Sequence, residues 1–365
     1  MDAELKATEQ AHLRRALELA DRGRGRVSPN PLVGAVIVRD EQAIGEGFHA
    51  ELGGLHAERA ALADCRERGE DPAGATMYVT LEPCAHQGRQ PPCVEAILEA
   101  GIGRVVIASE DPSEKAAGRG PGILRDGGVE VAFATGAEAT AARRLNQPFR
   151  KHARTGLPLV ILKMAMSLDG RTATAPGDSP WISGPESREL VHRWRAEHDA
   201  IAVGIGTALA DDPLLTARVE DARQPKRVIF DSQARLPLDS RLLQSLDESP
   251  VLVVTAPDAP NDRISSLKEA DAEIIPAPDI ESALRELGRR EVTSLFLEGG
   301  RTLASSFLSA DQVDQSRTFI APMLLGNPNP ASRAAVTGPA RLNALSHEVE
   351  PIGDDLLIQA RYKEW

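Results

Sequence analysis

The sequence of 365 residues lacks the features of a membrane, secreted or nucleic-acid-binding protein. No apolar run approaches the roughly 18 residues that a membrane span needs. The opening residues carry acidic side chains throughout, where a signal peptide would have a basic start and an apolar block. A formal net charge of -12 repels polyanions over the surface, although a local basic pocket could still hold one phosphate. We therefore expect a cytoplasmic protein whose main partner is neither a membrane nor a nucleic acid.

Cysteine is also scarce, with only Cys65, Cys84 and Cys93 in the chain. An odd and sparse set in a cytoplasmic protein indicates metal binding or a catalytic thiol before it indicates disulfides. Cys65 falls inside a helical pattern, and we interpret it as a small buried residue of that helix.

Length and periodicity predict two α/β domains, because 365 residues exceed the size at which one hydrophobic core keeps growing. The first half has a helix, a β-hairpin and an α-β-α-β order, which favours a sheet covered by helices on both faces. We place the boundary within the stretch 147–158, which gives domains of residues 1–147 and 148–365. The expected helices are 3–22, 56–68, 92–100, 137–146, 186–197, 262–270, 280–289 and 301–309, and the expected strands are 32–38, 43–49, 76–81, 104–108, 159–164, 200–203, 227–231, 251–255, 294–298 and 318–321.

The most informative pattern is His56-Ala57-Glu58 at a helix start, followed by Pro83-Cys84 and then Cys93 before another helix. One imidazole and two thiolates leave a tetrahedral zinc with one open position. Water in that position has its pKa lowered to about 7. Glu58 can approach the same water and carry protons, as in the His-x-Glu and Pro-Cys pattern of zinc deaminases, in which the glutamate is not a ligand. The alternative is a closed structural zinc site or a coincidental cluster, and Cys65 is the only spare thiol for a fourth ligand.

These segments resemble the bifunctional deaminase/reductases of riboflavin biosynthesis. Eight residues separate Cys84 from Cys93, where the general deaminase pattern has two, and this long spacer is typical of the riboflavin family. The resemblance continues through Ser28–Gly34, Asp111-Pro112 and Ala117–Gly120. Leu55 stands where proline often precedes His-Ala-Glu, and Ser113 stands where asparagine is usual, which removes one expected hydrogen bond to the substrate.

For the first half, the resemblance implies a cytidine-deaminase-like α/β/α sandwich that acts on 2,5-diamino-6-(5-phosphoribosylamino)pyrimidin-4-one. Zinc hydroxide would attack the ring carbon that bears the 2-amino group, and Glu58 would carry a proton to the departing ammonia. The implied substrate contacts are Asn30, His49, His86 and Arg89. From the residues alone, Asn30 could instead be a turn residue between prolines, and His49 a solvated strand end.

The second half carries no complete cofactor fingerprint. Gly204 and Gly206 follow one expected strand and Gly299-Gly300 follows another, where glycine lets backbone N–H groups approach a phosphate. Neither pattern is the full Gly-x-Gly-x-x-Gly motif, and on spacing alone ordinary turn glycines explain both better. The resemblance covers residues 162–171, 179–183 and 210–218, and it implies a dihydrofolate-reductase-like α/β domain that uses NADPH to reduce the ribose C1′ of the deaminated product.

The resemblance implies two sets of residues in this second domain. The cofactor would be held by Ala165, Trp181, Thr207, Asp211, Ser232 and a loop at 300–306 that includes Gly300, Arg301, Thr302 and Leu303. The substrate would be held by Lys163, Ser179, Arg195, Leu215, Arg218 and Glu298. Arginine suits a phosphomonoester, because its guanidinium is permanently charged and binds in a bidentate manner, although Arg195 and Arg218 could also be surface residues. Lys163 could polarise the sugar or be a snorkelling lysine, and Trp181 could stack on the cofactor or fill the core.

Three functions remain compatible with the sequence. The first is a two-step enzyme with one Zn²⁺ per chain and NADPH, acting on a small pyrimidine ribosyl phosphate; we expect it to be a homo-oligomer. The second is a zinc deaminase whose C-terminal domain is a catalytically silent nucleotide-binding or oligomerisation domain. The third is a non-enzymatic, zinc-stabilised nucleotide-binding module. Oxidation of NADPH separates the first two, and release of ammonia separates both from the third.

Overall fold

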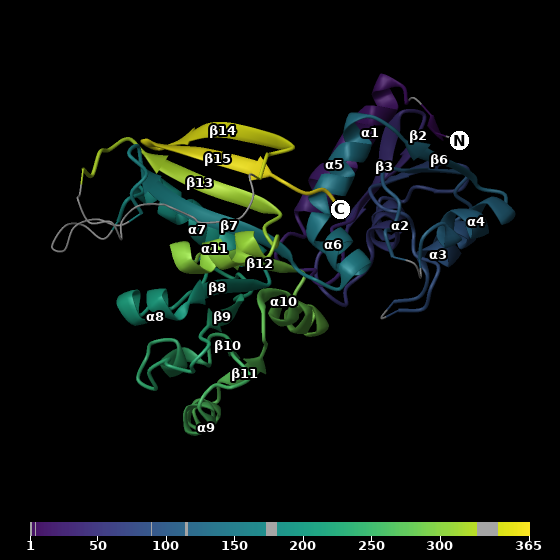
Figure 1. Cartoon of the computed structure of the whole chain (residues 1–365). Helices are drawn as coiled ribbons and strands as arrows, with labels where there is room; N and C mark the ends of the chain where they lie inside the picture. Colours follow the sequence, from purple (N-terminus) through teal and green to yellow (C-terminus); the bar gives the residue numbers. More distant parts are fainter. Residues whose placement is uncertain (1, 4, 89, 114–115, 173–180, 327–341) are drawn as a thin grey trace. The chain divides into compact units, whose positions relative to one another are not determined.

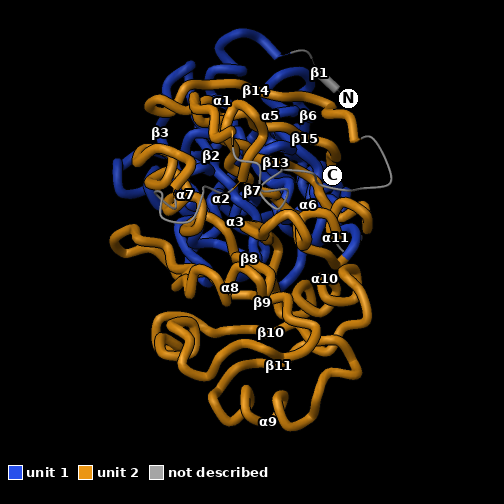
Figure 2. Tube along the Cα trace, turned by 60° about the vertical axis from the view of Figure 1, so that its left-hand side comes forward, with its two compact units in different colours: residues 1–155, 365 blue, residues 156–364 orange. Residues whose placement is uncertain are grey.

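The structure, a computed structural model, describes residues 2–3, 5–88, 90–113, 116–172, 181–326 and 342–365 (Figure 1). The chain divides into two compact units: residues 1–155 together with Trp365, and residues 156–364 (Figure 2). The boundary expected from the sequence assigns residues 148–155 to the second domain. They form the helix α6 (Gln147–Thr155), which groups with the first unit because its residues Gln147, Arg150 and Lys151 are buried there.

The first unit is a sheet with helices on both faces. The sheet has the order β1-β6-β5-β4-β2-β3. The strands are β1 (Asp2–Ala3), β2 (Gly34–Arg39), β3 (Gln42–Phe48), β4 (Thr76–Val79), β5 (Arg104–Ile107) and β6 (Glu130–Ala134). Besides α6, the helices are α1 (Ala7–Asp21), α2 (Ala57–Glu67), α3 (Cys93–Glu99), α4 (Arg119–Asp126) and α5 (Ala137–Leu145).

The two faces of this sheet bury different helices. Leu13 of α1 and Ala142 of α5 pack with Val36 and Val106 on one face. Residues of α2, α3 and α4 pack on the other face, in one cluster with Ile37, Met77 and Ile107. The observed layers are those of the predicted α/β/α sandwich. The sequence did not indicate α4, whose first turns contain Gly120, Pro121 and Gly122, residues with poor helix propensity.

The second unit is built on a larger sheet with the order β11-β10-β9-β8-β12-β7-β13-β15-β14. Its strands are β7 (Leu159–Ser167), β8 (Ala200–Gly204), β9 (Lys226–Phe230), β10 (Val251–Thr255), β11 (Glu273–Pro276), β12 (Ser294–Leu297), β13 (Gln315–Ala321), β14 (Ser346–Ile352) and β15 (Asp355–Arg361). Its helices are α7 (Pro185–Glu197), α8 (Ile205–Asp211), α9 (Asn261–Glu269), α10 (Ile280–Arg289) and α11 (Arg301–Ser309), with a 3₁₀ turn at Leu243–Ser245.

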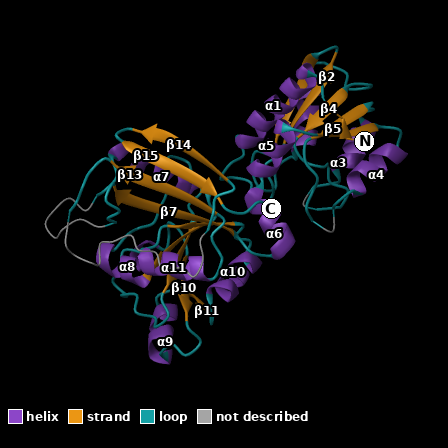
Figure 3. Cartoon of the chain, turned by 45° about the horizontal axis from the view of Figure 1, so that its top comes forward, coloured by secondary structure: helices purple, strands orange, loops and turns teal. Residues whose placement is uncertain are grey.

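Helices lie against this sheet as well (Figure 3). Leu284 of α10 and Phe307 of α11 share a core with Leu162 and Leu297. Trp194 of α7 stacks on Phe319 of β13, with ring centroids 5.5 Å apart. The strands β14 and β15 were not predicted. In β14 no residue is buried, so the sequence lacks the alternation that indicates a half-buried strand. Among the described residues, no helix is long and apolar enough to cross a membrane.

Candidate active sites

The amino end of α2 sets the position of His56 and Glu58 in the first unit. A Cβ on Gly47 would lie 2.2 Å from the Ala61 nitrogen, so only glycine allows α2 to approach β3 this closely. His56 is the extended residue before α2, and Glu58 lies in its first turn, 3% exposed. A carboxylate in this position also interacts favourably with the helix dipole. The helix therefore brings an imidazole and a buried carboxyl group to one end of the sheet.

His56, Cys84 and Cys93 form a compact cluster, with their ligand atoms all within 4.8 Å of one another. His56 Nδ1 lies 3.6 Å from Cys84 Sγ and 3.4 Å from Cys93 Sγ. A tetrahedral zinc with ordinary bond lengths requires nitrogen–sulfur separations of about 3.6 Å. The trio therefore fits zinc in both chemistry and spacing. Cys65 is fully buried within α2, and its Sγ faces Glu70 O at 3.5 Å, so it does not supply a fourth ligand.

The electrostatics of this cluster separate the roles of its acidic groups. Burial raises the pKa of Glu58 to about 7, and the nearby Cys84 sulfur adds to the rise. Hydrogen bonding from Cys93 lowers the pKa of Cys84 to about 4, with a further contribution from His56. Glu58 is thus poised to gain and lose a proton near neutral pH, and Cys84 is stable as a thiolate, the form that binds metals.

Asn30 and His49 lie beside the cluster. The ring of His49 is 5.4 Å from that of His56, and its Nδ1 donates to Leu55 O at 2.9 Å. The remaining nitrogen, Nε2, then accepts from Asn30 Nδ2 at 3.0 Å. His49 is 3% exposed, so it is not the solvated strand end that we considered, and burial lowers its pKa. The two side chains form a neutral hydrogen-bonding pair next to the predicted metal ligands.

The other predicted deaminase contacts are less constrained. His86 is exposed, and Arg89 lies outside the described residues. Ser113 donates from both its backbone nitrogen (2.8 Å) and its hydroxyl (2.7 Å) to Asp111 Oδ1. Its hydroxyl proton is therefore already used, and toward a substrate Ser113 offers only an acceptor.

Two buried charged residues near this site had no role in our sequence analysis. Glu82 lies within the matched motif, but a motif match does not reveal what the side chain contacts. Its Oε2 lies 3.5 Å from Asp111 N, and it is 5% exposed. Arg150 lies in no motif, and its partners Ser109 and Glu110 are 41 and 40 positions away along the chain. No local pattern could have indicated it.

In the second unit, the predicted residues gather where parallel strands end. The strands β9, β8, β12 and β7 are adjacent and parallel. Ser232 follows β9, Glu298 follows β12, and Ala165 lies near the end of β7. The carboxyl ends of parallel strands in open α/β sheets are the usual place for ligands. Asp211 ends α8, which begins directly after β8.

The glycine loops after β8 and β12 adjoin each other. A Cβ on Gly300 would lie 3.6 Å from Thr207 Oγ1, so these two predicted cofactor residues are neighbours. A Cβ on Gly206 would meet no atom within 4 Å, which leaves open space beside this backbone. Arg301 and Thr302 are exposed, whereas Leu303 is buried and packs beneath Gly299. The open backbone fits a phosphate-bearing cofactor, with Leu303 as a support from below.

Arg195, Glu298 and Lys163 form one charged cluster. Arg195 binds Glu298 through two hydrogen bonds of 2.6 and 3.0 Å, and it donates to Thr216 O at 3.2 Å. Burial lowers the pKa of Lys163. Burial alone would raise the pKa of Glu298, but the positive charges of Arg195 and Lys163 outweigh it and hold that pKa below its usual value. Lys163 is therefore a half-buried member of the cluster, with its Nζ 6.0 Å from the centre of the Phe319 ring. The guanidinium of Arg195 is largely occupied by Glu298.

The remaining predicted residues occupy varied positions. Arg218 is exposed, and Leu215 is 3% exposed with φ of 56°. Trp181 is 60% exposed with the Arg188 guanidinium 5.2 Å from its ring, so it does not fill the core. Ser179 lies outside the described residues. Sequence analysis missed His192, whose pKa is lowered by burial and by the charges of Arg195 and Arg218; its three-residue spacing from Arg195 on α7 was an available signal.

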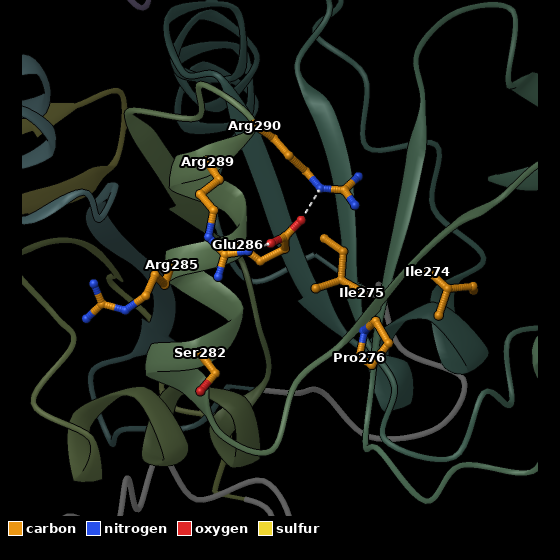
Figure 4. A pocket seen from close by; sticks show the side chains of 8 residues that line it. All are labelled: Ile274, Ile275, Pro276, Ser282, Arg285, Glu286, Arg289 and Arg290. Carbon is orange, nitrogen blue, oxygen red and sulfur yellow. Dashed lines mark hydrogen bonds and ion pairs between the residues drawn. The ribbon is translucent and has the colours of Figure 1, made fainter.

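A cavity of about 350 Å³ lies elsewhere in this unit, between α10 and the edge strand β11 (Figure 4). Its described lining residues are Ile274, Ile275, Pro276, Ser282, Arg285, Glu286, Arg289 and Arg290. Arg290 Nε pairs with Glu286 at 3.0 Å, and Arg285 pairs with Glu281 at 2.8 Å. None of the predicted site residues is among those that line it, and its arginines are neutralised by glutamates.

Comparison with known families defines the class of protein in two parts. Residues 6–109 match the family described as the cytidine and deoxycytidylate deaminase zinc-binding region. Residues 158–358 match the RibD C-terminal domain. The chain is therefore a zinc-binding deaminase domain followed by a RibD-type reductase domain.

Full-length relatives identify the family. The chain is 39% identical over 361 residues to the riboflavin biosynthesis protein RibD of Actinobacillus pleuropneumoniae, covering 96% of this chain and 94% of that protein. It is 37% identical to Acinetobacter baumannii RibD, with a TM-score of 0.84 and coverage of 98% and 99%. The deaminase/reductase of Thermotoga maritima is 36% identical, with a TM-score of 0.85 and the same coverage. The chain belongs to the RibD family and is a deaminase and reductase of riboflavin biosynthesis, which confirms the predicted family, fold class and activity.

Proposed function

We propose that this chain deaminates 2,5-diamino-6-(5-phosphoribosylamino)pyrimidin-4-one at its 2-amino group and then reduces the ribosyl chain to ribityl with NADPH. The observation that carries the first step is the trio of His56, Cys84 and Cys93 beside the buried carboxyl of Glu58. Activity names printed for the Thermotoga maritima relative, a diaminohydroxyphosphoribosylaminopyrimidine deaminase and 5-amino-6-(5-phosphoribosylamino)uracil reductase, support both steps. A cytoplasmic homo-oligomer remains our expectation.

In the deamination step, His56, Cys84 and Cys93 would hold one zinc, leaving its fourth position open. Bound zinc would supply a water that is activated near neutral pH. Asn30 and His49, already aligned by their mutual hydrogen bond, orient the pyrimidine through polar contacts. Glu58 carries the proton to the departing amino group, since its pKa of about 7 lets it exchange protons at working pH.

In the reduction step, the strand-end glycine loops and Thr207 would hold the NADPH phosphates, with Ala165, Trp181, Asp211, Ser232 and residues 300–303 around the cofactor. Bound NADPH would supply the hydride for C1′. Lys163 and Glu298 orient the ribosyl hydroxyl groups as a half-buried pair of opposite charge. Because Glu298 engages Arg195, we assign the substrate phosphate chiefly to Arg218 and give Arg195 the role of holding Glu298 and the residue 216 loop in place.

The direct test is a coupled assay on the diaminopyrimidinone substrate that follows ammonia and NADPH together. Ammonia release followed by NADPH oxidation is the expected result. Ammonia release without NADPH oxidation, even with deaminated substrate supplied, would favour the second function, in which the C-terminal domain is silent.

Replacing Arg218 tests the phosphate assignment. We expect Arg218→Ala to raise the reductase KM for substrate by about one to two decades, because a hydrogen bond to a charged group contributes roughly 1.5–3 kcal/mol. The affinity for NADPH should stay near that of the parent. Arg193→Ala is the matched control, because Arg193 is an exposed arginine of α7 in the same unit and is not assigned to the substrate. Reductase kinetics in Arg218→Ala equal to those of the parent would remove Arg218 from the substrate site.

A further inference from the structure

The segment that leaves β5, residues 108–113, is tied to the loop that carries Cys84. We call it the β5 exit segment. Glu82 N donates to Ser109 O at 3.0 Å, and Asp111 N lies 3.5 Å from Glu82 Oε2. Since Cys84 follows Glu82 by two residues, a displacement of the β5 exit segment would be transmitted to the zinc loop.

A single buried guanidinium holds the other side of the β5 exit segment. Arg150 of α6 is 1% exposed. Its Nη1 donates to Ser109 Oγ and to Glu110 O, both at 3.1 Å, and its Nη2 donates to Glu110 Oε1 at 2.6 Å. Arginine presents its donors in a fixed planar fork, so these three contacts set the position of both backbone and side chain.

The Nε–H of Arg150 is used by Trp365, which belongs to the first unit although it follows β15 in the sequence. Arg150 Nε donates to Trp365 O at 2.6 Å. Gln147 accepts from Trp365 N at 2.8 Å and donates to its oxygen at 3.1 Å. Lys151 Nζ lies 5.3 Å from the centre of the indole ring. The end of the chain lies beside α6 in the view of Figure 1.

We propose that Arg150, fixed in turn by Trp365, is a positioning residue for deamination: it sets the β5 exit segment against the zinc loop so that the pyrimidine binds in a productive geometry. The inference rests on the proposed function, because the segment affects catalysis only if the pyrimidine is bound beside it. Arg150 makes its hydrogen bonds to Ser109, Glu110 and Trp365, none of them a predicted ligand, so it acts through the segment. A consequence is that the residue after the last reductase strands influences the deaminase.

The test compares full-length, zinc-loaded variants. Arg150→Ala should lower kcat/KM for ammonia release by roughly 10- to 100-fold, mostly through KM, since a displacement of about 1 Å can cost that much. Trp365→Ala keeps the backbone oxygen that accepts from Arg150 and removes the ring over Lys151, so it should act in the same direction with a smaller effect. Trp365→Phe, which restores a ring over Lys151, should recover the parent KM. Zinc content and the reduction of supplied deaminated substrate should not change. The matched control is Arg154→Ala: Arg154 is on the same helix but exposed, and its Nη2 is 4.0 Å from the same Glu110 oxygen.

Amide hydrogen exchange gives a readout that is independent of activity. Exchange in the β5 exit segment should accelerate in Arg150→Ala and Trp365→Ala, while amides of β5 itself keep their protection. If the parent releases no ammonia, the proposed function fails. Hydrogen exchange then still tests whether Arg150 holds the β5 exit segment in place. If Arg150→Ala does not fold, Ser109→Ala and Trp365→Ala decide. Parent-like kinetics and exchange in the folded variants, or an equal loss of both activities, would overturn the inference.

Discussion

Glu58→Gln should retain zinc and lose ammonia release, by about 10²-fold or more, because glutamine keeps the size of the side chain but cannot carry a proton. The structure supports this separation: Glu58 is buried beside the ligand trio, and the trio itself consists of His56, Cys84 and Cys93. The variant should still reduce deaminated substrate near the parent rate, since the reductase residues lie in the other compact unit.

The reciprocal variant completes a two-by-two comparison. Glu298→Gln weakens the ion pair with Arg195 and removes the charge opposite Lys163, so reduction should fall while ammonia release stays near the parent rate. Both activities are measured on both variants, with zinc content and thermal unfolding as controls for integrity. A folded, zinc-loaded Glu58→Gln protein that had lost both activities could not be reconciled with two independent sites.

The clustering of His56, Cys84 and Cys93 was predictable because its determinants are local. His56 and Glu58 are two residues apart at the start of one helix, so both reach the same end of the sheet. Cys84 follows the strand β4, and Cys93 is the first residue of the helix α3. The spacing of the ligands along the chain therefore carries most of the geometry that the structure shows, with nitrogen–sulfur distances of 3.4 and 3.6 Å.

Roles that depend on long-range pairing were not predictable. The family resemblance implies separate substrate contacts for Arg195 and Glu298, and it gives no sign that the two side chains pair with each other across 103 positions. Whether an arginine is free for a ligand depends on which acceptors the fold brings to it, and no motif carries that information. The same limit applies to Arg150, because its partner Ser109 lies 41 positions before it and its partner Trp365 lies 215 positions after it.

The sequence did not predict the secondary-structure elements whose residue patterns carry a weak physical signal. The helix α4 contains two glycines and a proline, which disfavour a helix, and α6 includes Pro148 and has Phe149 as its one large apolar side chain, so neither carries a stripe of apolar residues at helical spacing. The exposed strand β14 has no buried face. By contrast, β8, β10 and β12 are nearly continuous apolar runs, as expected for strands buried on both faces of a parallel sheet, and the sequence indicated all three.

Cys84→Ser should lose most of its zinc and with it nearly all deamination. Cys84 Sγ lies 3.6 Å from His56 Nδ1, and its pKa of about 4 keeps it a thiolate, whereas a serine hydroxyl stays protonated at neutral pH and is a poor zinc ligand. Two protein ligands then remain, fewer than the three of a catalytic zinc site. The measurement is zinc per chain by elemental analysis after desalting, with ammonia release and NADPH oxidation followed in parallel.

Cys65→Ser is the matched control for that experiment, because Cys65 is also in the first unit but lies inside α2, away from the trio. Glu70 O, 3.5 Å from Cys65 Sγ, offers a partner for the new hydroxyl. It should keep one zinc per chain and the parent deaminase rate. Reduction of supplied deaminated substrate should persist in both variants, since the residues proposed to hold the metal all lie within the first unit. Full zinc in Cys84→Ser would remove Cys84 from the metal site, and loss of zinc in Cys65→Ser would point to a closed structural site in place of a catalytic one.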